Sequence, residues 1–169
     1  RVISGRAKGV VLKTPDGMLT RPTSDRVKEA MFSIIQFELP GATVLDLFGG
    51  TGQLGIEALS RGAKSAVFVD AREESCRLIR ENLKRTDYSG QASVICSDYL
   101  SFLGKTSEKF DIVLLDPPYA EKYLENPRES NHREIQKSHH YLPRYSDFNT
   151  SAISSAFSLI CSETPIILS

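Results

Sequence analysis

Residues 43–55 read Thr-Val-Leu-Asp-Leu-Phe-Gly-Gly-Thr-Gly-Gln-Leu-Gly, an apolar run that leads into a glycine-rich turn. The run predicts a buried strand over residues 43–48, the glycines predict a turn over 49–52, and the next stretch predicts a helix over 54–61 that ends at Gly62. The spacing G-x-G-x-x-G begins at Gly50, where glycines let the backbone approach a ligand closely. Asp70, about 20 residues further on, is placed to accept hydrogen bonds from the two ribose hydroxyls of an adenosine.

The alternation of short apolar runs and helical stretches continues through the middle of the chain. It predicts strands at 66–70, 93–96 and 110–115, a helix at 99–103, and a helix at 72–84 whose inner face carries Cys76, Ile79 and Leu83. Strands that alternate with helices form βαβ units, in which the strands are parallel. The predicted fold class is therefore α/β, a Rossmann-like, doubly wound and mainly parallel sheet.

The first 40 residues predict a small basic extension of this core. Apolar segments at 2–3 and 10–12 flank Ser-Gly-Arg-Ala-Lys-Gly and predict a β-hairpin with a basic tip. A helix capped by Thr23 or Ser24 follows, ends at Pro40-Gly41, and has one predicted apolar face: Val27, Ala30, Met31, Ile34 and Ile35. Residues 1–30 carry seven basic and three acidic side chains, so this arm is about +4 and the remainder about −4.

Composition indicates one ordinary globular domain. The chain has 169 residues, of which 40% are hydrophobic and 25% charged, and its formal net charge is zero. We expect three parts of one domain: the hairpin and helix at 1–40, a cofactor-binding catalytic core at 41–124 and an atypical tail at 125–169. No apolar run approaches the roughly 20 residues of a spanning helix and no signal-peptide pattern is present, so we expect a cytoplasmic monomer without a membrane partner. Cys76, Cys96 and Cys161 stand far apart, which predicts buried thiols and neither a disulfide framework nor a metal site.

Two further aspartates indicate the kind of ligand. Asp46 lies inside the first predicted strand, three residues before the first glycine. A carboxylate there would repel the pyrophosphate of a dinucleotide but could bind a cationic amino-acid moiety, which favours S-adenosylmethionine over NAD. Asp98 follows the third predicted strand and could accept a hydrogen bond from the exocyclic amine of adenine, or could cap the next helix.

Residues 116–119 read Asp-Pro-Pro-Tyr and directly follow the fourth predicted strand. Two consecutive prolines have no N–H donors, so carbonyl groups here stay free to accept hydrogen bonds from another molecule. Asp116 and the Pro117 carbonyl could hold both N–H groups of a base amine while Tyr119 stacks on the ring. This arrangement would aim the amine lone pair at a methyl carbon bound to a sulfonium, without a strong general base. The alternative is a turn that only ends the strand.

With these residues, the chain resembles the class I S-adenosylmethionine-dependent methyltransferases. Within them it looks like the bacterial family that methylates the N2 amine of one guanine in small-subunit ribosomal RNA. Three stretches carry the resemblance: residues 1–6 with 19–26, residues 44–62, and residues 110–119. The resemblance implies S-adenosylmethionine as cofactor and ribosomal RNA or the small ribosomal subunit as partner.

The resemblance also implies roles for individual residues. The cofactor would be bound around the glycine turn and after the next two strands, by Asp46, Phe48, Gly49, Gly50, Gly52, Asp70, Ala71, Asp98 and Tyr99. The target base, turned out of its stack, would be held by the catalytic residues Asp116, Pro117, Pro118 and Tyr119. RNA phosphates would be bound by the basic arm, through Arg1, Arg6, Lys8, Arg21, Thr23 and Arg26.

Residues 125–169 depart from the family pattern, which continues through a helix and three further strands. Only residues 156–161 and 165–168 resemble strands, so we expect an irregular tail, and a sheet edge left open if the last strands are missing. Three other functions remain compatible with the motifs. They are a methyltransferase acting on adenine N6 in DNA, a nicotinamide-dependent oxidoreductase, and a catalytically impaired remnant that binds RNA or cofactor.

Overall fold

The structure is a computed structural model that describes residues 1–15 and 25–116, and the backbone of one further strand near the end of the chain. In chain order the elements are α1 (Asp25–Ile34), β1 (Thr43–Asp46), α2 (Gln53–Ser60), β2 (Ser65–Asp70), α3 (Glu73–Thr86), the 3-10 helix η1 (Ser89–Gln91), β3 (Ala92–Cys96), α4 (Tyr99–Leu103), β4 (Phe110–Leu114) and β5 (Cys161–Leu168). Between Thr43 and Leu114 every predicted element is present, with bounds within two residues of the predicted ones.

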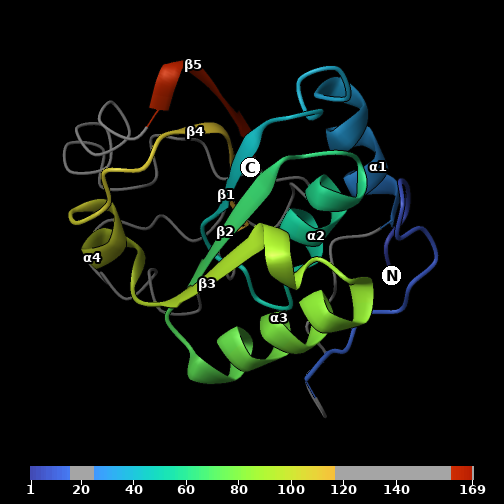
Figure 1. The fold of residues 1–169 in the computed structure, drawn as a ribbon, viewed down its shortest axis with the longest axis horizontal. Helices are drawn as coiled ribbons and strands as arrows, with labels where there is room; N and C mark the ends of the chain where they lie inside the picture. The colour runs from blue at the N-terminus through green and yellow to red at the C-terminus, as the bar shows by residue number, and fades with distance from the viewer. Residues whose placement is uncertain (16–24, 117–160, 169) are drawn as a thin grey trace, which may run out of the picture.

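The five strands form one parallel sheet in the order β3-β2-β1-β4-β5 (Figure 1). The chain runs outward from β1 through β2 to β3 and then crosses to the other side of β1 for β4. The carboxyl ends of β1 and β4 therefore meet at the point where the strand order reverses, which is where doubly wound sheets bind ligands. The predicted Rossmann-like fold class is confirmed.

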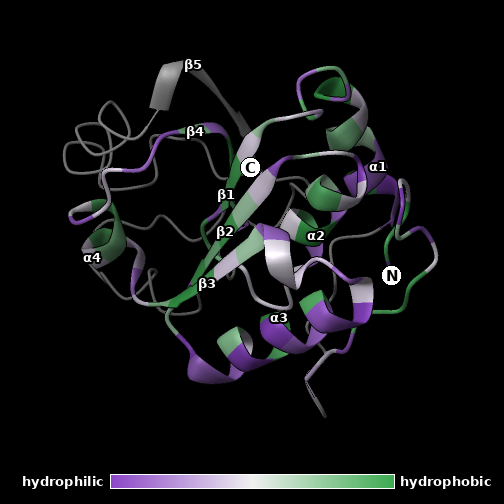
Figure 2. Ribbon diagram, viewed as in Figure 1, coloured by the Kyte–Doolittle hydropathy of each residue, from purple (hydrophilic) through white to green (hydrophobic). Residues whose placement is uncertain are grey.

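The strands β1, β2 and β4 bury alternate side chains in two separate apolar clusters, one on each face of the sheet. Val44 and Phe68 belong to the cluster beneath α1, α2 and α3, whereas Leu45 and Val67 belong to the cluster beneath α4. Figure 1 shows α4 on the opposite side of the sheet from α1, α2 and α3. In Figure 2, α3 is hydrophilic over most of its surface with hydrophobic patches, as expected of a helix that covers a sheet with one face. The predicted inner face of α3 is confirmed, because Cys76, Ile79 and Leu83 are all buried.

The buried face of α1 differs from the predicted one. Of the predicted set only Ile35 is buried, while Val27 is 46% exposed and Ile34 is 72% exposed. The helix ends at Ile34, before Pro40, and the buried positions there and in the following turn are Lys28, Phe32, Ile35 and Leu39. Both sets have helical spacing, so the pattern alone does not choose between them. Lys28 can lie inside because its Nζ donates to the Arg1 carbonyl at 2.9 Å and lies 3.6 Å from the Asp25 carboxylate.

Residues 1–15, which are called the arm from here on, contain no regular strand. The predicted β-hairpin is therefore wrong, although its two segments do contact each other. Val2 N donates to the Val10 carbonyl at 2.9 Å, and Gly9 N donates to the Val2 carbonyl at 2.9 Å. These two hydrogen bonds close a loop whose tip contains the exposed side chains of Arg6 and Lys8. Other backbone N–H groups of the arm donate to side chains of α2 and α3 and not to another strand.

The last strand confirms the predicted strand at 165–168 and corrects the expectation of an irregular tail only over Cys161–Leu168. β5 pairs in parallel with β4, with Phe110 opposite Cys161 and Ile112 opposite Ile166, so one edge of β4 is covered. From Phe110 to Ile112, β4 advances by two positions while β5 advances by five, from Cys161 to Ile166. This irregular stretch contains Pro165, which has no N–H to donate to a neighbouring strand. The predicted strand stretch 156–161 lies outside the described residues except for Cys161.

The buried face of α1 can be tested with two phenylalanines. Phe32 is fully buried, with the Arg61 guanidinium 4.9 Å from its ring centroid, whereas Phe37 is 85% exposed. We expect Phe32→Ala to lower the free energy of unfolding by about 3–5 kcal/mol, because it leaves a cavity in the core. The matched variant Phe37→Ala should change it by no more than about 0.5 kcal/mol. Urea denaturation of both variants gives the comparison, and equal losses would contradict the observed face.

Candidate active site

The glycine turn after β1 is held by one backbone hydrogen bond to β2, by one hydrogen bond within the turn and by close packing on α3. Gly49 N donates to the Val69 carbonyl at 3.0 Å and Gly52 N donates to the Gly49 carbonyl at 2.6 Å. Gly50 and Gly52 have φ values of 54° and 79°, in the left-handed region that side chains disfavour. A Cβ on Gly49 would lie 2.8 Å from Ile79 Cδ1, so this glycine lets the turn pack closely on α3.

Asp46 is the last residue of β1 and is 1% exposed. Its Oδ2 accepts a hydrogen bond from Gly55 N at 2.9 Å. Burial raises the pKa of Asp46 to about 7; the Gly55 hydrogen bond opposes this shift, and the nearby carboxylates of Asp116 and Asp70 add to it. Three acidic groups therefore lie close together at the end of β1.

Asp70 ends β2 and binds the glycine turn directly. Its Oδ2 accepts from Gly50 N at 2.9 Å, and its Oδ1 accepts from Arg72 N at 2.9 Å. A carboxylate has about four acceptor positions, so both oxygens keep capacity for ligand hydroxyls. Asp70 thus shapes the turn as well as lying where the ribose contact is predicted, and the adjacent Ala71 is exposed.

Asp98 and Tyr99 lie at the start of α4. Asp98 caps this helix, because its Oδ1 accepts from Ser101 N at 2.9 Å, and this hydrogen bond lowers the pKa of the carboxyl group. The capping alternative is therefore confirmed, and the exposed side chain can still accept from a ligand. The ring of Tyr99 is 5.3 Å from that of Phe48, which links α4 to the glycine turn. The structure thus brings together the predicted cofactor residues from β1, β2 and α4.

Asp116 is exposed and follows β4 by two residues. Because Leu114 is the register partner of Asp46, Asp116 comes near the end of β1, as its effect on the pKa of Asp46 also indicates. The other predicted catalytic residues, Pro117, Pro118 and Tyr119, lie outside the described residues. The structure therefore places one of the four.

The predicted RNA-binding cations lie in or near the arm, and two of them contact acidic residues. Arg1 Nε lies 2.9 Å from the Asp25 carboxylate, and Arg6 Nη2 lies 3.3 Å from that of Asp87. The Arg6 guanidinium also lies 5.4 Å from the ring centroid of Tyr88. Lys8 and Arg26 are exposed, while Arg21 and Thr23 lie outside the described residues.

Three buried polar side chains that the sequence analysis missed hold the arm in place. Glu57 accepts from Ile3 N at 2.8 Å and from Ser4 N at 3.0 Å. Ser60 Oγ accepts from Ala7 N at 3.0 Å, and Asn82 binds both backbone groups of Lys13. Their sequence signal is a polar residue on the apolar face of a helix, such as the glutamate within Leu-Gly-Ile-Glu-Ala-Leu at 54–59.

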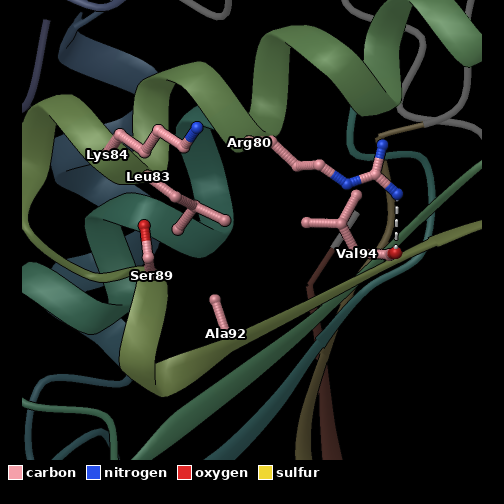
Figure 3. A pocket seen from close by; sticks show the side chains of 6 residues that line it. All are labelled: Arg80, Leu83, Lys84, Ser89, Ala92 and Val94. Carbon is pink, nitrogen blue, oxygen red and sulfur yellow. Dashed lines mark hydrogen bonds between the residues drawn. The ribbon is translucent and has the colours of Figure 1, made fainter.

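Other features of the described residues have no assigned part in this site. A shallow hollow between α3 and β3 is lined by Arg80, Leu83, Lys84, Ser89, Ala92 and Val94, and Arg80 Nη2 donates across it to the Val94 carbonyl at 3.1 Å (Figure 3). Cys76 is buried as predicted, but Cys96 is exposed, and both are free. Within the described ranges, no group of three or more His, Cys, Asp or Glu side chains is placed to hold a metal ion. No helix in the same ranges has the length and apolar character needed to span a bilayer.

Comparisons with known proteins agree with this arrangement. The chain is 43% identical over 127 residues to the Putative rRNA methyltransferase YlbH of Bacillus subtilis, covering 73% of this chain and 69% of that protein. It is 38% identical over 125 residues to the Ribosomal RNA small subunit methyltransferase D of Escherichia coli strain K12, covering 74% of this chain and 63% of that protein. This chain therefore spans less than two thirds of the length of the second relative.

Solved structures that resemble this chain also include proteins described as methyltransferases. A putative methyltransferase, yhhF, from Escherichia coli aligns with a TM-score of 0.64 and 35% identity, over 73% of this chain and 66% of that one. The putative methylase HI0767 from Haemophilus influenzae aligns with a TM-score of 0.59 and 33% identity, over 73% of this chain and 66% of that one. Residues 1–139 match the family Cons_hypoth95, described as Conserved hypothetical protein 95. Because this match spans most of the 169 residues, the chain belongs to the conserved hypothetical protein 95 family.

Proposed function

We propose that this protein is a methyltransferase that transfers a methyl group from S-adenosylmethionine to the exocyclic N2 amine of a guanine in small-subunit ribosomal RNA. Two relatives that are 43% and 38% identical to it carry the names of ribosomal RNA methyltransferases, which supports the reaction class and the kind of substrate. The guanine and its N2 position rest on the resemblance carried by the sequence motifs.

The observation that carries the proposal is the acidic character of the glycine turn. Asp46 and Asp70 end adjacent strands beside this turn, and Asp116 follows the strand on the other side of β1. Their mutual repulsion contributes to the raised pKa of Asp46. A pyrophosphate would add negative charge to this cluster, whereas the ammonium and sulfonium groups of S-adenosylmethionine would offset it. The charge therefore favours this cofactor over a nicotinamide dinucleotide.

The described residues can be assigned to the parts of S-adenosylmethionine. Asp46 with Gly49, Gly50 and Gly52 would hold the methionine part, Asp70 the ribose, and Asp98 with Tyr99 the adenine. A Cβ built on Gly50 would meet only the Phe48 carbonyl oxygen, at 3.8 Å. When bound, the cofactor supplies a methyl group activated by the positive sulfur.

The chain's own part in the reaction is to hold the base amine. In the proposal, Asp116 and the Pro117 carbonyl accept its two N–H bonds while Tyr119 stacks on the ring. The amine lone pair is then directed away from the ring system and toward the methyl carbon, so positioning supplies most of the rate advantage. The amine nitrogen would form a bond to the methyl carbon as the carbon–sulfur bond breaks and S-adenosylhomocysteine leaves, and the proton that the nitrogen loses would go to Asp116 or to water.

The arm would bind RNA through its exposed cations. Arg1 and Arg6 already contact Asp25 and Asp87, but exposed ion pairs of this kind contribute only about 0–1 kcal/mol. Exchange of those carboxylates for phosphates therefore costs little. Lys8 and Arg26 add further exposed positive charge on the arm and on α1.

A DNA adenine-N6 methyltransferase would use the same amine-holding chemistry and remains the second candidate. Competition distinguishes the two. Methyl transfer to undermethylated small subunits should be suppressed by added ribosomal RNA and should not be suppressed by an equal mass of duplex DNA. The reverse result would favour DNA. A protein that binds the cofactor and labels neither nucleic acid would be the catalytically impaired remnant.

The first test of the proposal concerns Asp116. Asp116→Ala should lower methyl transfer to undermethylated small subunits by roughly 100- to 1,000-fold, the effect of removing one positioned hydrogen-bonding group. Cofactor affinity, measured by calorimetry, should fall far less than methyl transfer, because the methionine and ribose contacts remain and only one of three nearby carboxylates is lost. Glu108→Ala is the control, since Glu108 is an exposed acidic residue that precedes β4, at the other end of this strand from Asp116. A loss of cofactor affinity in the Asp116 variant as large as its loss of methyl transfer would contradict the assigned role.

The second test uses the pKa of Asp46, which lies at about 7. Below this pH the side chain is mostly neutral, and above it the side chain is a carboxylate that attracts the cofactor ammonium. Cofactor affinity should therefore rise with pH up to about 7 and level off above it, falling about tenfold for each pH unit below the pKa. Asp46→Asn should bind weakly at every pH. An affinity of the wild-type protein that decreases as pH rises would contradict the contact.

The third test concerns the arm. The double variant Arg6→Glu with Lys8→Glu should bind ribosomal RNA more weakly, and the slope of log affinity against log salt should decrease by about 1.4 for two lost phosphate contacts on single-stranded RNA. Lys105→Glu is the control, because Lys105 is exposed just after α4, on the opposite face of the sheet from the helices that hold the arm. Unchanged affinity in the double variant, measured by filter binding across a salt series, would refute the function of the arm.

A further inference from the structure

Asn82 lies on the inner side of α3 and is fully buried, with 0% of its surface exposed. Its side-chain amide makes three hydrogen bonds to two segments that are far apart in sequence. Oδ1 accepts from Lys13 N at 2.7 Å, and Nδ2 donates to the Lys13 carbonyl at 3.0 Å and to the Thr51 carbonyl at 2.8 Å. One side chain therefore holds the arm and the glycine turn at the same time.

The contact with Thr51 bears on the cofactor site directly. Thr51 lies between Gly50 and Gly52, the two glycines with left-handed backbone angles. The left-handed backbone angles of these two glycines orient the peptide groups on either side of Thr51. In the peptide after Thr51, the Gly52 N–H donates to the Gly49 carbonyl and the Thr51 carbonyl accepts from Asn82. Asn82 fixes the carbonyl of this residue, while Asp70 fixes the N–H of Gly50 at 2.9 Å.

The contact with Lys13 bears on the arm. Asn82 pairs with both backbone groups of this residue, so the contact does not depend on which side chain stands at position 13. The Lys13 ammonium separately lies 2.7 Å from the Glu81 carboxylate, on the exposed side of the same helix. Glu57 and Ser60 on α2 hold residues 3–7 in the same way, so the whole arm is attached to the two helices that flank the glycine turn.

Burial makes the two contacts of Asn82 interdependent. Both N–H groups of the amide are used, one toward the arm and one toward the glycine turn. If either segment moves away, the amide of Asn82, which is 0% exposed, loses a hydrogen-bond partner, and this costs free energy. The arm and the turn are therefore stable together in the arrangement seen here.

We propose that Asn82 is a positioning residue that couples the arm to the glycine turn, so that cofactor bound at the turn orders the arm for RNA. The coupling rests on the proposed function, in which the turn binds S-adenosylmethionine and the arm binds RNA. Coupling between two binding sites is reciprocal, so RNA bound to the arm strengthens cofactor binding by the same factor. The protein would thereby engage RNA more strongly when it carries cofactor.

Hydrogen exchange of the full chain tests this coupling, with S-adenosylhomocysteine as a stable probe. In the wild-type protein, saturating probe should slow exchange of the amides at 49–52 and also of the arm amides at positions 3, 4, 7 and 13. In Asn82→Ala, the probe should still protect the turn but no longer the arm. Its affinity should fall about tenfold, the effect of losing one well-made hydrogen bond at the turn.

A second pair of variants removes one of the two hydrogen bonds between Asn82 and the arm without changing α3. Lys13→Pro lacks the N–H that Asn82 accepts, whereas Lys13→Ala keeps it, and both lose the ammonium group. Probe-induced protection of the arm should persist in Lys13→Ala and disappear in Lys13→Pro. This pair decides the question even if Asn82→Ala does not fold.

The outcomes separate the coupling from the proposed function. If the probe protects the turn of the wild-type protein but not the arm, or protects the arm equally in Asn82→Ala or Lys13→Pro, the coupling is wrong and the cofactor assignment stands. If the probe neither binds the wild-type protein by calorimetry nor protects the turn, the cofactor assignment itself fails, and the coupling fails with it. An arm that responds only when the Asn82 contacts are intact supports the proposal.

Discussion

The close contact between α2 and the sheet at Gly55 is the constraint on which the site depends. A Cβ on Gly55 would overlap the ring of Phe68, so only glycine lets the helix approach β1 and β2 to this distance. At this approach Gly55 N reaches the buried carboxylate of Asp46 at 2.9 Å. The hydrogen bond between Asp46 and Gly55 thus joins the strand before the glycine turn to the helix after it, so the turn is held at both ends.

The same helices connect this turn to the arm by polar rather than apolar contacts. Glu57 and Ser60 on α2 and Asn82 on α3 bind backbone groups of residues 3–13. Glycine again permits the approach, because a Cβ on Gly5 would overlap the Ser60 carbonyl. Because these buried side chains bind backbone groups, the arm has a defined path, and its cations are presented from a fixed support.

The zero net charge of the chain is the sum of two separate distributions. The arm region is about +4, and the rest of the chain, about −4, includes the acidic residues that gather at the glycine turn. Burial raises the pKa of Asp46, the charges of Asp116 and Asp70 add to this shift, and the cluster of carboxyl groups suits a cationic ligand. A polyanion and a cationic cofactor can therefore bind the same small domain at different places, which the total charge does not reveal.

The sequence by itself determined the βαβ order, the glycine turn and the acidic strand ends, because strand and helix periods and glycine spacing are local properties. It also indicated Asp98 as a helix cap or a ligand contact, and the cap is present. Only the tertiary structure decided which face of α1 is buried, that β5 covers β4, and that Asn82 joins the arm to Thr51. These features depend on which distant segments meet. Two adjacent faces of a helix can have equally plausible apolar patterns, and a polar residue on an inner face does not reveal its partner, until the neighbouring segment is in place.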